Sequence, residues 1–132
     1  MNLSLRAPFK VTEWERAPDE NDEIADIARA RIRKQFSGEM DATSVANAIL
    51  YLTPVQSGGY TAIERITGKI GDREGSFVVM HSGIRDTDGG GPVYGDVVPG
   101  SGTGDFEGVT GSMTIEQDDT GEYFQLDLIL TK

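Results

Sequence analysis

The chain carries one carboxylate and one imidazole, Glu64 and His81, whose predicted positions suit proton transfer. Around Glu64 the apolar residues Ala62, Ile66 and Ile70 recur at every second position, so Glu64 points to the same side of a strand. His81 likewise shares the parity of the apolar residues that precede it in the next predicted strand. A carboxylate beside an imidazole orients the ring and raises its basicity, as general acid–base catalysis requires.

The short loop between these two strands predicts a β-hairpin. For both apolar faces to point inward, His81 must lie opposite Glu64, or one diagonal step away, opposite Ile66. The structural alternative to a catalytic pair is an interior hydrogen bond that satisfies two buried polar groups. One imidazole with one carboxylate is a poor ligand set, so the sequence predicts neither a metal nor a cofactor.

Further side chains are candidates for contacts near the same interior. Trp14, Tyr94 and Phe106 are large aromatic residues close to predicted strand ends or loops, where they could line the mouth of a ligand cavity. Core or rim packing is the alternative for all three. Glu39 is a candidate to join the polar network. Arg65 is another, although its outward parity also fits a surface charge.

Three motifs that suggest chemistry fail when their neighbours are considered. Residues 100–104 have the composition of a phosphate-binding loop, but acidic residues follow and no lysine or helix does. Residues 86–88 begin like a calcium loop that lacks its closing glutamate. Residues 119–121 match the aspartic-protease triplet, but their polar neighbours indicate a hairpin turn. We assign none of the three to a site.

The charge balance restricts the partners. The 132 residues include 22 acidic and 12 basic side chains, for a net charge of −10. Such a surface repels phosphate backbones and anionic lipid, so neither a nucleic-acid nor a membrane partner is expected. The one basic cluster, interpreted as a solvated strand face, consists of Arg29, Arg31, Arg33 and Lys34. Cysteine is absent, which excludes thiolate zinc sites and cysteine nucleophiles.

No repeat, low-complexity tract or linker divides the chain, which predicts a single domain over residues 1–132. The first residues contain no apolar stretch of signal-peptide length, and no segment approaches the length of a transmembrane span. We therefore expect a cytoplasmic protein.

Runs of strand length, separated by glycine-rich turns, predict an all-β sandwich or barrel. The clearest alternation lies at residues 122–130, where every second residue is phenylalanine or leucine. Residues 24–36 are the exception, because their apolar side chains recur at helical spacing and predict an amphipathic helix. The same segment read as a strand also places its apolar residues on one face.

Several segments resemble a bacterial family of small proteins of unknown function. They are residues 36–39, 64–68, 75–81 and 98–111, together with Trp14. The family is similar to the allene oxide cyclase-like barrel, a closed barrel of eight antiparallel strands. The resemblance implies strands at residues 24–38 and 45–52, and it overrides the helix because tertiary pairing outweighs local propensity. Plant cyclases of this form bind an oxygenated fatty-acid derivative inside the barrel, but no residue here matches their reactive site, so the resemblance implies a fold and no activity.

Two functions remain. In the first, the barrel interior binds a small apolar or amphipathic ligand, with cyclase- or isomerase-like proton chemistry at Glu64 and His81. In the second, a non-catalytic barrel with a packed interior acts in structure or protein interaction as a homodimer or higher homo-oligomer. Ile63 and Ile129, outward by parity, are candidates for that contact. We favour the first, because a carboxylate in an apolar inward row costs stability unless it is partnered.

Overall fold

The computed structural model describes residues 1–18 and 27–131, which form strands joined by turns. The strands are β1 (Asn2–Pro18), β2 (Ile27–Phe36), β3 (Asp41–Leu52), β4 (Gly58–Ile70), β5 (Arg73–Arg85), β6 (Val93–Val97), β7 (Thr103–Gly104), β8 (Thr110–Asp118) and β9 (Gly121–Ile129). Within this described part of the chain there is no helix, and so none that could cross a membrane.

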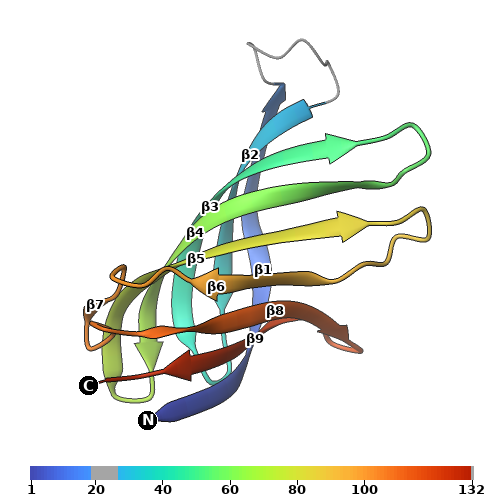
Figure 1. Ribbon diagram of the computed structural model, residues 1–132. Coiled ribbons are helices and arrows are strands. Elements are labelled where there is room, and N and C mark those ends of the chain that lie inside the picture. Colours follow the sequence, from blue (N-terminus) through green and yellow to red (C-terminus); the bar gives the residue numbers. More distant parts are fainter. Residues whose placement is uncertain (19–26, 132) are drawn as a thin grey trace.

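Eight of these strands close into a barrel (Figure 1). Neighbours follow the order β4-β3-β2-β1-β9-β8-β6-β5, and pairing of β4 with β5 completes the ring. Every pairing is antiparallel, and the two-residue β7 lies against β5 beyond the stretch that pairs with β6. The predicted all-β, closed eight-stranded antiparallel barrel is therefore confirmed. We call the end formed by the β3–β4 and β5–β6 connections the mouth.

The helical pattern at residues 24–36 does not form a helix. Residues 27–36 are strand β2, which pairs along its length with β1 and β3, as the resemblance implies. Alternate side chains from Ala28 to Phe36 face inward, and Arg29, Arg31 and Arg33 face solvent. Two ladders of backbone hydrogen bonds and a buried face outweigh the local helix preference. Residues 24–26 lie outside the described residues.

The barrel interior has two different halves. The half away from the mouth is filled by large side chains, most of them almost fully buried: Phe36, Met40, Ile66, Phe77, Phe106, Met113, Phe124, Leu126 and Leu128. Toward the mouth, the inward positions of β2, β3 and β4 are occupied largely by small side chains: Ala28, Ala30, Ala46, Ala48 and Ala62. Because these side chains are small, this half of the interior is filled less densely than the other.

A β-bulge in β1 turns Trp14 toward that space. Val11 pairs with Lys34 and Trp14 with Ile32, with a register shift between residues 11 and 13. The extra residue, Thr12, reverses the alternation of the strand, because a bulge sets two residues against one. Val11 and Trp14 therefore share the inner face despite their odd separation.

The β4–β5 hairpin has a different register from both of the predicted ones. Ile70 pairs with Arg73, which sets His81 opposite Ala62. The loop is only two residues long and begins with Gly71 at a φ of 60°, the position where type II′ turns place glycine. The turn is tighter than the glycine-rich segment suggested. His81 therefore pairs with Ala62, two residues away from the nearer predicted partner, Glu64, and both Glu64 and His81 still face inward.

Candidate functional site

Glu64 lies at the centre of a buried polar cluster and is itself fully buried. Its Oε1 accepts hydrogen bonds from His81 Nε2 at 2.7 Å and from Lys34 Nζ at 3.0 Å. Its Oε2 accepts one from Ser44 Oγ at 2.5 Å. Strands β2, β3 and β5 thus each direct one buried donor at a carboxylate on β4.

The sequence pattern predicts that Lys34 lies on a solvated basic face. This prediction was wrong, because the side chain of Lys34 points into the barrel interior. Even-numbered residues of β2 point inward, and Lys34 is only 6% exposed. Its Nζ lies 4.9 Å from the ring centroid of Phe9 and 5.0 Å from that of Phe124. The ammonium is therefore held by one carboxylate and two aromatic rings, which offset much of its lost hydration.

The pKa of Glu64 is lowered despite its burial. Burial alone would raise this pKa, because it penalises the charged form. The hydrogen bond from His81, the charge of Lys34 and the hydroxyl of Ser44 act in the opposite direction and together outweigh burial. Glu64 is therefore ionised at neutral pH and can only accept hydrogen bonds, so the proton between it and the imidazole is carried by His81 Nε2.

Tyr60 extends this cluster. Its hydroxyl lies 2.7 Å from His81 Nδ1. When the imidazole carries its single proton on Nε2, Nδ1 presents a lone pair that accepts a hydrogen bond from the Tyr60 hydroxyl. Burial, followed by the negative charges of Glu64 and Glu122, raises the pKa of Tyr60, so the phenol keeps its proton. Two hydrogen bonds thus connect a buried carboxylate with a tyrosine hydroxyl through one imidazole.

Tyr60 and His81 line a partly open cavity in the alanine-rich half of the barrel. The cavity has a volume of about 170 Å³, and its walls are mainly apolar. Trp14, Ile32, Ala62 and Glu122 are among its lining residues. Tyr60 also lines a second hollow of about 340 Å³ at the mouth. We call the hydrogen-bonded path from Glu64 through His81 to Tyr60 the relay. Its Tyr60 end therefore lies where a small molecule could reach it from outside.

The structure brings only some of the predicted site residues together. Trp14 lines the cavity with half of its surface exposed, and Glu64 and His81 form the cluster behind it. Tyr94 points outward and is 60% exposed, since its neighbours in β6 take the inward positions. It therefore does not line the cavity.

Glu39 and Phe106 lie away from the cavity, contrary to expectation. The Glu39 carboxylate accepts a hydrogen bond from the backbone N–H of Arg6, in the turn between β2 and β3 at the opposite end of the barrel. Phe106 is buried against Phe77, with ring centroids 5.3 Å apart, and so belongs to the filled half. Neither position could be assigned to an end of the barrel without knowing the strand register.

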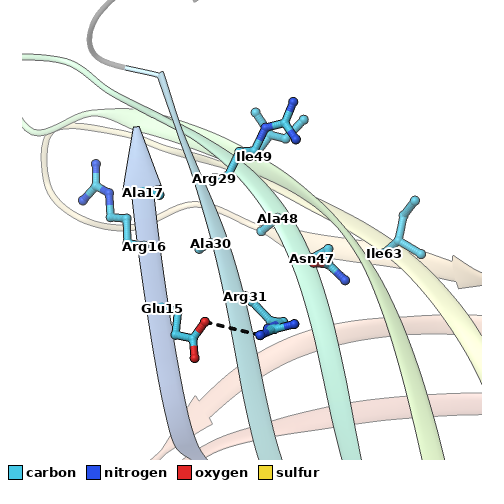
Figure 2. A pocket seen from close by; sticks show the side chains of 10 residues that line it. All are labelled: Glu15, Arg16, Ala17, Arg29, Ala30, Arg31, Asn47, Ala48, Ile49 and Ile63. Carbon is cyan, nitrogen blue, oxygen red and sulfur yellow. Dashed lines mark hydrogen bonds and ion pairs between the residues drawn. The ribbon is translucent and has the colours of Figure 1, made fainter. Parts of the chain in front are cut away.

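A larger hollow, of about 630 Å³, lies on the outer surface of β1 to β4 (Figure 2). Its polar contact is the ion pair between Glu15 and Arg31, 3.4 Å apart, with both side chains about half exposed. Ile49 and Ile63 form part of its wall. No buried polar group is directed into this hollow from the residues the structure describes, so its size alone does not make it the candidate site. The described residues likewise contain no cluster of three His, Asp or Glu side chains that could hold a metal ion.

Comparison with known proteins supports the fold and assigns no activity. No curated protein sequence matches the chain. A crystal structure of a protein of unknown function from Shewanella oneidensis MR-1 is similar, with 29% sequence identity and a TM-score of 0.87. The similarity covers 100% of this chain and 99% of that one. A model of the DUF3224 family, described as proteins of unknown function, matches residues 5–129. Because the match spans nearly the whole sequence, the chain belongs to the DUF3224 family.

Proposed function

We propose that the protein binds a small, largely apolar molecule with one polar group in the cavity between Trp14 and Tyr60, and that Tyr60 and His81 exchange a proton with it. The observation that supports this most strongly is the position of the Tyr60 hydroxyl. It belongs both to the cavity wall and to a hydrogen-bonded path leading to a buried, ionised carboxylate. Apolar walls with a few convergent polar groups are typical of small-molecule sites.

The cost of the cluster also favours a functional role. Moving two charges out of water costs several kcal/mol per ion, and packing apolar side chains in their place is often about as stable. The interior already contains a dense apolar core beside the cluster, so the fold has an alternative way to fill this space. A role in ligand chemistry gives a reason for the buried charges that stability alone does not.

The relay can move a proton without forming a free phenolate. The ligand gives a proton to the Tyr60 oxygen while the original hydroxyl proton passes to His81 Nδ1. The resulting imidazolium keeps its hydrogen bond to Glu64, whose negative charge stabilises it. Reversing the transfer to a different atom of the ligand completes an isomerisation. Because the pKa of Tyr60 is raised, transfer of both protons together is favoured over a separate ionisation of the phenol.

The test is binding of 2-naphthol, a fluorescent aromatic alcohol whose emission reports its surroundings and proton acceptors. Ala62→Leu adds bulk on the inner face beside His81, and Thr61→Leu adds similar bulk on the outer face of the same strand. We expect wild type and Thr61→Leu to bind equally, and Ala62→Leu to bind at least about tenfold more weakly. Circular dichroism is used to check that both variants fold.

Two outcomes would overturn the proposal: no binding to wild type, or equal binding by folded Ala62→Leu. Tyr60→Phe keeps the cavity and removes the hydroxyl, so it provides a second readout that depends less on folding. This variant should still bind 2-naphthol, but the emission of the bound naphthol should change, because the naphthol hydroxyl then has no Tyr60 hydroxyl with which to exchange a proton.

An alternative function as a self-associating barrel has one observation in its favour. Ile63 and Met80 are cross-strand partners on the outer face, and each is about half exposed. Ile129, also half exposed, remains a second candidate contact. Sedimentation equilibrium of wild type and Ile63→Ser tests this alternative, which requires an oligomer that the substitution weakens.

A further inference from the structure

Two arginines line the hollow at the mouth of the barrel. Arg16 follows the bulge in β1 and has inward parity, and Arg85 is the last residue of β5. Both side chains contribute to the hollow of about 340 Å³ that also reaches Tyr60. Figure 2 shows Arg16 projecting from β1 away from the ion pair that Glu15 forms with Arg31. Arg16 therefore borders both the outer hollow and the mouth, whereas Arg85 lines only the mouth.

Neither arginine has a charge partner within residues 1–18 and 27–131. Other basic side chains do, including Arg31, Arg33, Lys34 and Lys69. Both guanidinium groups are therefore available to an anion that enters the hollow. Arginine is well suited to bind oxyanions, because its planar fork donates two parallel hydrogen bonds.

The loop after β5 packs beside the guanidinium of Arg85. A Cβ atom added at Gly89 would lie 3.5 Å from the Arg85 Nη2 atom, an ordinary contact distance, so the guanidinium lies directly beside this loop. Gly91 has a φ of 153°, and a Cβ there would overlap the carbonyl oxygen of Ile84. This turn thus depends on glycine where it passes the arginine, and it forms one wall of the hollow.

The remaining walls are apolar. Leu50, Leu52, Ile84 and Val93 line the same hollow, and Leu50 is shared with the inner cavity. An apolar wall bearing two guanidinium groups at its edge matches a molecule with a hydrocarbon body and one anionic end. Local attraction is necessary for such a ligand, since the net charge of −10 repels anions at long range.

We propose that the ligand is an amphipathic organic anion, whose oxyanion binds Arg16 and Arg85 while its body extends past Leu50 to the hydroxyl of Tyr60. This inference rests on the proposed function, because it uses the same cavity and adds the chemical class of the molecule that enters it. Carboxylate, sulfonate and phosphate ester share the required chemistry.

Two matched probes test the charge alone. They are 2-naphthol and 6-hydroxy-2-naphthoate, which has the same ring and hydroxyl with a carboxylate at the far end. We expect wild type to bind the naphthoate at least about tenfold more tightly, and the double variant Arg16→Gln/Arg85→Gln to lose that difference. Binding of 2-naphthol should change less than about twofold. Arg65→Gln, an exposed arginine on β4 remote from the mouth, is the control and should behave as wild type.

The outcomes separate this inference from the proposed function. If the double variant binds the naphthoate as wild type does, or if Arg65→Gln weakens it equally, the anion site is refuted. If wild type still binds 2-naphthol and Ala62→Leu still weakens that binding, the proposed cavity function stands even though the anion site is refuted. If neither probe binds wild type, both are refuted. Raising the salt concentration should weaken only the naphthoate, and an unchanged affinity would also contradict the anion site.

Discussion

Replacing Glu64 with glutamine is expected to destabilise the protein by about 3 kcal/mol, because it leaves the ammonium of Lys34 buried without a counter-charge. Breaking one partner of a buried pair generally costs about 3–5 kcal/mol. The lower end applies here, since the amide oxygen can still accept hydrogen bonds from His81 and Lys34, and the Ser44 hydroxyl can turn to accept from the amide nitrogen. The cost is therefore concentrated in one unpaired charge.

Urea unfolding at neutral pH, followed by circular dichroism, measures this difference. The double variant Glu64→Gln/Lys34→Met removes both charges and keeps an unbranched side chain between the rings of Phe9 and Phe124. We expect it to recover to within about 1 kcal/mol of wild type. Glu74→Gln, which breaks an exposed pair with Lys69, is the surface control and should have no measurable effect.

Two results would show that the unpaired ammonium of Lys34 does not cause the loss of stability. One is a Glu64→Gln variant within about 1 kcal/mol of wild type, which would mean that the charge of Glu64 contributes little to the buried cluster. The other is a double variant no more stable than the single one. In that case the cost would arise from lost packing or hydrogen bonding and not from the unpaired ammonium of Lys34.

Protonation of the same cluster has further measurable consequences. Since folding lowers the pKa of Glu64 below its ordinary value of 4.5, its ionised form stabilises the protein above that pH, and this contribution is lost as the pH falls through the lowered value. The stability advantage of wild type over Glu64→Gln should therefore shrink below about pH 4.5, and an advantage that persists unchanged in stronger acid would contradict it. Nitrogen-15 NMR of the imidazole should show the proton of His81 on Nε2, whereas a proton on Nδ1 alone would reverse the direction of the relay. Tyr60→Phe should lower the free energy of unfolding by about 1 kcal/mol, the usual net value of a hydrogen bond, and an unchanged value would show that the hydroxyl does not contribute to stability.

Strand parity was sufficient to place the two groups at the centre of the site. Glu64 lies in a row of inward apolar residues, and His81 does the same on the neighbouring strand, so both had to face the interior. The register was not predictable, because the glycine-rich segment between the strands allows loops of several lengths. The hydrogen bond between the two forms nonetheless, since diagonal neighbours on one face are within reach of long side chains.

Other members of the site were missed for identifiable reasons. Lys34 lies among arginines, and composition favoured a solvated face, although its even-numbered position matches those of Ile32 and Phe36. Tyr60 has the same parity as Glu64, but its contact with His81 depends on the register. The inward direction of Trp14 depends on a bulge at Thr12, and nothing in the local sequence marks a bulge there.

The proposed function requires that the hydrogen-bonded path from Glu64 through His81 to Tyr60 opens onto a cavity that accepts a small molecule. A crystal structure of the protein grown with 2-naphthol tests it most directly. We expect naphthalene density beside Ala62, with the naphthol oxygen within hydrogen-bonding distance of the Tyr60 hydroxyl. An interior closed by side chains, or an imidazole turned away from Glu64, would contradict it.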